Sequence, residues 1–347
     1  AYFTSPSAVN DAVMTMYGYM STQRCLGASG SKTTIIRSDE ASSNSDYGKP
    51  GMFGADLNAS YYTIEQPYTL MYTTASQASY IIETAPSVDF SGNEELRNAY
   101  MGEAYFWRAF AHYYLLINFR NISPIRQMPR NGDDYVRPLE KPAAVWDFIQ
   151  EDLAHAKELL PVKGYWDSKN AGRVTKASAA ALLGKAYLYR SGIEQYYGED
   201  KTTFYSEAAK EFGDVIDGKY GTYDLTKNYA DNFDVAHENN EESILEFQFL
   251  GDVDNAGFNP GLATSGLAFD SRGLMLPGAG VGYEGVVHNW LYNAFVNSID
   301  KDGYTDIRMF STMIFNDLDA SIHLRNDAGG NPVRLEGPGG YKWEELY

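Results

Sequence analysis

Residues 93–119, NEELRNAYMGEAYFWRAFAHYYLLINF, decide the fold class of this chain. Large apolar side chains recur there at helical steps, and smaller apolar residues fill the neighbouring stripe. The recurring positions are Leu96, Tyr100, Trp107, Phe110, Tyr114 and Ile117. A helix that is apolar on most of its sides is normally buried, so the stretch predicts a helix inside a core. Pro124 and Pro129 follow it and forbid its continuation.

The same helical periodicity extends to both sides of this stretch. Pro142 favours the start of one helix and Pro161 its end, while Thr175 is a good N-cap for another. The additional predicted helices cover residues 7–20, 59–84, 143–160, 176–190 and about 203–216. Between residues 93 and 218 the helices are joined by short connections, which predicts tetratricopeptide-like stacking of helix pairs. One strand is expected, at residues 244–250.

Two long segments lack this periodicity. Residues 30–58 are rich in Gly and Ser, residues 251–290 are rich in Gly, and both carry isolated aromatic side chains. Loops of this length in a compact protein usually form a functional surface. We therefore interpret both segments as loops of a ligand-binding face.

The composition excludes several classes of protein. The chain of 347 residues has 46 Asp and Glu against 28 Lys and Arg, a net charge of −18, so nucleic acid is not an expected partner. The lone Cys25 excludes a disulfide and a multi-cysteine metal site, and we expect it to be a small buried residue. The 28 Tyr outnumber the 17 Phe and 5 Trp, which favours partly wet packing or a surface for a polar ligand.

Six blocks of sequence, in order along the chain, carry a resemblance to a known family. They are AYFTSPSAVNDAVMTMYGYM (1–20), GEAYFWRA (102–109), AVWDFIQEDLAHAKELLP (144–161), GRVTKASAAALLGKAYLY (172–189), YSEAAKEFGDVIDGKYGTYDL (205–225) and NNEESILEFQF (239–249). These blocks resemble the SusD/RagB family of surface glycan-binding lipoproteins from Bacteroidetes.

The resemblance implies a mainly α fold, with a tetratricopeptide-like scaffold, a loop-rich ligand face and minor β-structure. Residues 1–347 then form a single SusD-like domain with a helical-repeat core at 93–218 and without the family's closing helices. The implied function is capture of oligosaccharide or polysaccharide for a SusC-like TonB-dependent transporter, without catalysis. The implied location is the cell surface of the outer membrane, through a lipidated cysteine and signal peptide that this chain does not contain.

Sugar binding needs flat rings that stack on pyranose faces and fixed polar groups for the hydroxyls. Such residues gather in the non-periodic segments and beside the start of the helix predicted at 59–84, where the resemblance also implies ligand contacts. The predicted ligand-binding residues are Asn58, Tyr61, Tyr62, Arg37, Asp39, Asn44, Tyr47, Tyr283, Trp290 and Arg272. By contrast, we expect Glu103 and Arg108 of the family motif to link helices.

Metal and catalytic sites have little support in the sequence. Asp300, Asp302 and Asp306 have the spacing of a calcium loop but lack its third alternate acid and late Glu, so a turn followed by a helix cap explains them better. No cofactor is expected, and no nucleophile-elbow or phosphate-loop motif is present. Two alternatives stay open: a tetratricopeptide-type scaffold that binds a protein segment, and a glycoside hydrolase that uses two of the many carboxylates.

Overall fold

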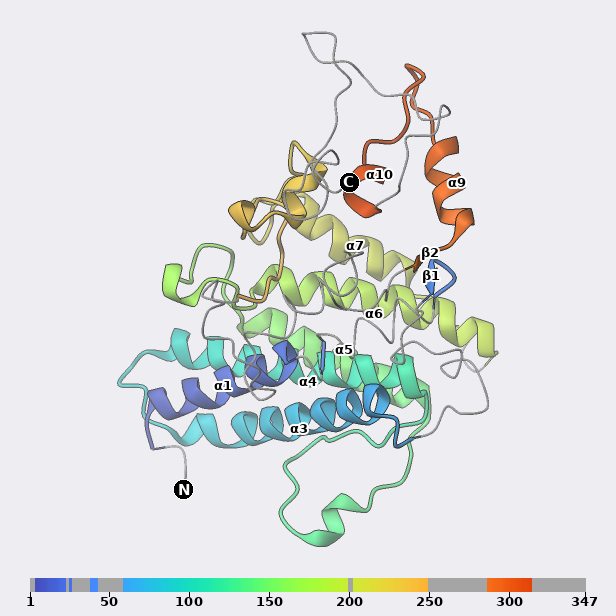
Figure 1. Ribbon diagram of the computed structural model, residues 1–347. Coiled ribbons are helices and arrows are strands. Elements are labelled where there is room, and N and C mark those ends of the chain that lie inside the picture. The colour runs from blue at the N-terminus through green and yellow to red at the C-terminus, as the bar shows by residue number, and fades with distance from the viewer. Residues whose placement is uncertain are drawn as a thin grey trace.

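The computed structural model describes residues 4–22, 25–26, 38–42, 59–198, 202–248 and 286–313. Figure 1 shows helices stacked in chain order, from α1 and α3 at one end to α6 and α7 at the other. The long helices are α1 (Pro6–Ser21), α3 (Tyr62–Thr84), α4 (Glu94–Phe119), α5 (Pro142–Leu159), α6 (Lys176–Tyr197) and α7 (Tyr205–Ile216). From α3 onward each helix packs on the next, and α1 packs on α3 and α4.

The shorter elements lie in the connections between the long helices or after α7 in the chain. The later helices and the strands are α9 (Asn289–Asn297), α10 (Met309–Thr312), β1 (Ala41–Ser42) and β2 (Val286–Val287). The 3₁₀ turns are η3 (Ala85–Ser87), η4 (Gly132–Tyr135), η5 (Ser168–Asn170), η6 (Tyr229–Phe233) and η7 (Val235–His237). The mainly α architecture predicted from the sequence is confirmed. No helix in the described ranges has the length and apolar character needed to cross a membrane.

Helix boundaries follow the caps that the sequence carries. The side chain of Asn93 accepts a hydrogen bond from the Leu96 N–H at 3.1 Å and begins α4. Pro142 occupies the first turn of α5, as expected. The Ser178 hydroxyl accepts from the N–H of the N-cap Thr175 at 3.1 Å, and α6 ends at Gly198 with φ 70°. Each predicted long helix therefore exists. Its ends differ from the prediction by three residues or fewer, except that α6 continues seven residues beyond the predicted end at residue 190.

The core is centred on α4. Trp107 is fully buried, and its ring centroid lies 4.9 Å from that of Tyr17, in a T-shaped arrangement, and 5.8 Å from that of Phe247. The predicted apolar stripe of α4 is confirmed except at Ile117, whose side chain is 38% exposed. Ile117 lies in the last turn of α4, where it lines an open groove with residues of α6. The apolar periodicity of the sequence continues into this last turn, but no element in the described part of the chain packs there closely enough to bury Ile117.

Small residues set the spacing between α6 and its neighbours. Ala177, Ala179 and Ala180 are fully buried, as expected for a helix with close neighbours. A Cβ added at Gly184 would lie 2.8 Å from the Phe212 ring of α7. A larger side chain at position 184 would therefore separate α6 from α7.

The strand predicted at 244–250 is wrong for the described residues 244–248, which contain no strand. The Ile244 carbonyl accepts from the Ser178 hydroxyl at 3.0 Å, while Leu245 and Phe247 pack on the main core. Among the described residues, its neighbours include Ser178 of α6, Asn239 and the turn at Gly172, and none of these belongs to a strand. Its apolar residues cover the helices instead.

Glu103 and Arg108 of α4 link neighbouring segments, as predicted. The Glu103 carboxylate receives two bonds from the Arg173 guanidinium, at 2.9 and 2.5 Å, and one from the Tyr17 hydroxyl at 2.7 Å. Arg108 makes a two-bond pair with Asp152 of α5, at 2.7 Å each. These side chains are almost fully buried, so loss of one partner would leave a charge in the core.

Candidate functional site

Four of the predicted ligand-binding residues lie in the part of the chain that the structure describes: Asp39, Tyr61, Tyr62 and Trp290. The others lie outside the described residues: Arg37, Asn44, Tyr47, Asn58, Arg272 and Tyr283. For Tyr62 the structure gives only its place as the first residue of α3.

The structure brings the two predicted loop groups together at Asp39 and Trp290. β1 pairs antiparallel with β2, with Ala41 opposite Val287. The Glu40 carbonyl accepts from the His288 N–H at 2.9 Å, and the Trp290 indole N–H donates to the Asp39 carbonyl. The Trp290 ring is nevertheless 46% exposed. The result is an exposed indole, held in place by a hydrogen bond to a backbone carbonyl.

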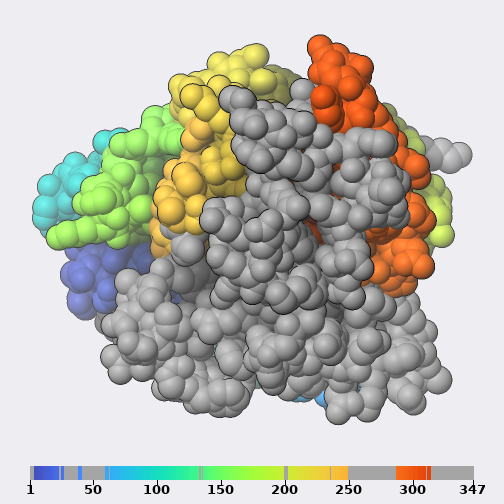
Figure 2. All heavy atoms as spheres, turned by 45° about the horizontal axis from the view of Figure 1, so that its top comes forward, coloured from blue at the N-terminus to red at the C-terminus, as the bar shows by residue number. Residues whose placement is uncertain are grey.

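A small apolar cluster is formed by residues next to Trp290 in the chain together with α10. Met309 and Met313 are buried there, with Val287, Leu291, Tyr292, Phe295 and Val296 packed against them. This cluster joins α9 and α10 and is separate from the main core. Figure 2 shows residues 286–313, in orange and red, on the same face as the yellow residues that follow α6.

Tyr61 lies at a different point, as the N-cap residue of α3. Its carbonyl accepts from the Ile64 and Glu65 N–H groups at 2.8 and 2.9 Å, and its side chain is partly exposed. In Figure 1 the start of α3 lies on the same side of the view as β1, β2 and α9. The backbone of Tyr61 is thus fixed by the helix that it begins.

The three aspartates considered for calcium form a turn and a helix start. The Asp300 carboxylate accepts from the N–H groups of Asp302 and Tyr304, at 2.8 and 3.0 Å. Asp306 pairs with the Arg308 guanidinium, which lowers the pKa of that carboxyl, and α10 begins directly afterwards. Nowhere in the described ranges do three or more Asp, Glu, His or Cys side chains gather to hold a metal ion.

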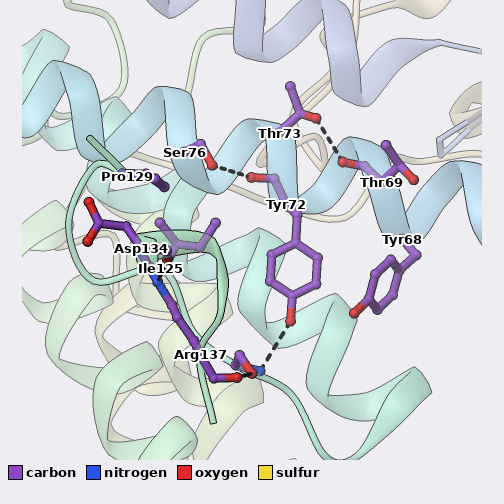
Figure 3. Close-up of a pocket in the computed structure, with 10 residues that line it drawn as sticks. Tyr68, Thr69, Tyr72, Thr73, Ser76, Ile125, Pro129, Asp134 and Arg137 are labelled. Carbon is purple, nitrogen blue, oxygen red and sulfur yellow. Dashed lines mark hydrogen bonds between the residues drawn. The ribbon is translucent and has the colours of Figure 1, made fainter. Parts of the chain in front are cut away.

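A pocket that the sequence analysis missed lies between α3 and the connecting segment 120–141 (Figure 3). Its volume is about 430 Å³. The α3 side is formed by Tyr68, Thr69, Tyr72, Thr73 and Ser76. Ser123, Asp134 and Arg137 contribute polar groups from the connection, and Ile125 and Pro129 contribute apolar surface. The only signal in the sequence is the run of hydroxyl residues on one side of a helix.

These features match one protein family. Residues 3–188 match the family model SusD-like_3, described as "Starch-binding associating with outer membrane". This chain belongs to the SusD-like family. The matched residues include α1, α3, α4, α5 and most of α6.

Relatives in the SusD-like family cover different parts of the chain. A SusD-like protein of Bacteroides ovatus is 29% identical over 180 residues, which are 52% of this chain and 32% of that protein. SusD-like protein P2 of Formosa agariphila is 25% identical over 265 residues, 74% of this chain and 49% of that protein. The match thus spans about a third to a half of the length of these relatives. A solved structure called a laminarin binding SusD-like protein superposes on 85% of this chain and 65% of its own, with TM-score 0.67 and 21% identity.

Proposed function

We propose that this SusD-like chain is a non-catalytic binding protein that captures oligosaccharide or polysaccharide at the outer-membrane surface. The family description and the laminarin-binding relative support this assignment. The observation that carries it in this molecule is the exposed Trp290 ring, fixed beside Asp39 where the two loop groups meet. A rigid ring next to polar groups is suited to one face of a sugar and its hydroxyls.

The proposal extends to a partner and an anchor. Captured glycan would pass to a SusC-like TonB-dependent transporter, and a lipidated cysteine outside this chain would hold the protein at the membrane. The family resemblance and the outer-membrane description support both. Co-purification of the full-length protein with the transporter from detergent-solubilised outer membranes tests the partner. Recovery of the protein from the same membranes without any transporter would contradict it.

Calorimetry and affinity electrophoresis with starch, laminarin and xyloglucan test the binding function. We expect micromolar to millimolar affinity for at least one polysaccharide. Trp290→Ala and Tyr61→Ala should each weaken it by about 1–3 kcal/mol, or roughly 5–150-fold, as expected of a hot-spot ring. Tyr196→Ala is the control, because this tyrosine of α6 is 85% exposed and lies outside both loop groups. Absence of binding to all three polysaccharides would overturn the proposal.

An assay of reducing ends on the same mixtures separates binding from hydrolysis. We expect no new reducing ends at protein concentrations that give full binding. Release of sugar that is abolished by a single Asp or Glu substitution would instead establish a glycoside hydrolase.

One observation favours a second candidate function, the binding of a protein segment. A groove of about 700 Å³ lies at the ends of α4 and α6 and the start of α7. Its exposed apolar side chains include Leu188 (43%), Tyr189 (39%) and Tyr197 (56%). Exposed apolar surface of this kind commonly marks an interaction site. Selection from a peptide library tests this function, and Leu188→Asp should abolish binding of the selected peptides while glycan affinity is unchanged.

A further inference from the structure

The face of α3 that lines the 430 Å³ pocket carries hydroxyl groups in place of charges. Positions 68, 72 and 76 are four residues apart and share one side of the helix, with positions 69 and 73 beside them. All five residues are Tyr, Thr or Ser. The charged residues of α3 are Glu65 and Glu83, near its two ends. A solvent-facing helix surface normally carries charged side chains, so this hydroxyl surface is unusual.

Two tyrosine rings in the pocket are held in fixed positions. The Tyr68 ring centroid lies 4.9 Å from that of Tyr72 and 4.9 Å from that of Phe119. The Tyr72 hydroxyl accepts from the Ser123 N–H at 3.2 Å, as Figure 3 shows. Tyr68 is still 39% exposed. Its ring is therefore held by neighbouring rings while part of its surface stays open to the pocket.

The other wall is held to the helices before any ligand arrives. Ile125 donates its N–H to His112 Nε2 at 2.9 Å and accepts from the Ser79 hydroxyl at 3.3 Å. The Arg126 carbonyl accepts from the Arg108 guanidinium at 2.9 Å. Within the connection, the Arg137 guanidinium donates to three backbone carbonyls. A preformed pocket costs a ligand less ordering than one that must assemble. Its volume lies in the range of about 300–1,000 Å³ that small-molecule sites occupy.

The charges at this wall balance each other. Asp134 accepts from the N–H groups of Arg130 and Asn131, at 2.7 and 3.2 Å, and Arg137 lies beside it in the pocket wall. One carboxylate and one guanidinium give no net charge for an ionic ligand. The hydroxyl oxygens of α3 can accept hydrogen bonds from sugar hydroxyls, because each carries two lone pairs. Tyr68 offers ring surface for an apolar sugar face.

We propose that this pocket is a second carbohydrate site, which binds one or two rings of a neutral sugar. The proposal deepens the proposed glycan-binding function and rests on it for the class of ligand. The pocket is distinct from the surface at Trp290: Figure 1 shows the segment 120–141 at the opposite end of the stack from α9 and α10, whereas Tyr61 lies seven residues before Tyr68 along α3. Two separate sites would let one molecule hold two parts of a polysaccharide, or two chains.

Titration with maltose, cellobiose and laminaribiose, followed by calorimetry and saturation-transfer NMR, tests this site. The starting protein is Trp290→Ala, in which the loop face is impaired. We expect it to keep affinity for at least one disaccharide. Adding Tyr68→Ala should lower that affinity by about tenfold or more. Thr69→Arg is the second probe, because it places a long side chain into the pocket from an exposed position of α3. Tyr196→Ala in the same background should change nothing.

The outcomes separate this site from the loop face. If none of the three disaccharides binds the Trp290→Ala protein, or if Tyr68→Ala and Thr69→Arg leave its affinity unchanged, the second site is wrong. In that case, polysaccharide binding that is lost in Trp290→Ala alone would still support the proposed function. If Trp290→Ala has no effect on polysaccharide binding and Tyr68→Ala abolishes it, the second site stands and the loop face loses its role.

Discussion

At the scale of residues, Trp107 and Trp290 show how surroundings decide the role of one side chain. Trp107 is fully buried among rings from other elements, whereas Trp290 is 46% exposed and held by its indole N–H. The Trp107 ring contributes to core packing, whereas the Trp290 ring has a face that is accessible to solvent. Removing each should therefore change a different property of the protein.

Trp107→Ala should cost about 3–5 kcal/mol of unfolding free energy, because it leaves a large cavity in the core. Trp290→Ala should weaken glycan binding and lower the melting temperature little. Chemical denaturation and calorimetric binding of the two variants check this pair. If Trp290→Ala destabilised the protein as much as Trp107→Ala, the exposed ring would have to be assigned to packing.

His112 should make stability sensitive to acid. Burial lowers the pKa of His112 from 6.5 to about 3. Its Nδ1 bonds the Arg108 carbonyl at 2.8 Å, and Nε2 accepts from the Ile125 N–H, so the ring is neutral with Nδ1 protonated. As the pH falls from 6.5 toward 3, the unfolded chain binds a proton that the folded chain does not. This residue should then reduce stability by up to about 1.4 kcal/mol per pH unit.

The variant His112→Gln isolates this effect. At pH 7 it should be less stable than the unmodified protein by about 1–3 kcal/mol, because the bonds of the ring are lost. Toward pH 5 the difference should shrink, since glutamine does not titrate. Urea denaturation at both values measures it. An equal difference at pH 7 and pH 5 would show that the pKa of His112 is the same in the folded and the unfolded chain, and would contradict its lowering by burial.

At the scale of elements, periodicity and caps allowed the long helices to be predicted. Which segments pack against each other could not be predicted from the sequence. Asn93, Pro142 and Thr175 begin helices through local bonds, so their effect is visible in the sequence. The apolar run at 244–248 is compatible with a strand or with a segment that covers helices. In the described part of the chain its neighbours include Ser178 of α6, the main core and the turn at Gly172, so it covers helices.

The two proposed binding surfaces could be predicted from the sequence only in part, for the same reason. The hydroxyl residues of α3 look like an ordinary polar face until the segment 120–141 is placed opposite them. That placement depends on buried contacts of Ser79, Arg108 and His112, which are distant along the chain. Asp39 and Trp290 likewise lie side by side only because β1 pairs with β2. Strands of two residues are too short to be predicted from the sequence.

Two glycines of α6 should respond oppositely to alanine. Gly184→Ala should destabilise by about 1–3 kcal/mol, because its Cβ would lie 2.8 Å from the Phe212 ring. At Gly192 nothing lies within 4 Å of the added Cβ, so Gly192→Ala should gain about 0.5–1 kcal/mol from helix propensity. Thermal denaturation of both variants compares them. Equal effects at the two positions would mean that α6 and α7 can separate freely.

At the scale of the whole molecule, the described chain has one large core and two smaller clusters, of which one lies between α6 and α7. The large core draws on α1 and on α3 to α6, whereas α9 and α10 share a cluster around Met309 and Met313. Stability is expected to be lower where few apolar side chains are buried. Backbone amides of α4 should therefore exchange with deuterium much more slowly than those of α9. Mass spectrometry of exchanged peptides measures this, and equal rates would contradict two regions of different stability.

The pairing of β1 with β2 also affects the order in which parts of the protein fold. Trp290 and Asp39 are 251 positions apart, whereas α3, α4, α5 and α6 each pack on the next helix in the chain. Contacts between near neighbours in sequence form quickly, and contacts that close very long loops form late. The scaffold should then form before the protein can bind through Trp290. During refolding, helical circular dichroism should return earlier than the glycan affinity proposed for Trp290, and a partly folded chain would then have its helical body while still lacking the proposed binding face.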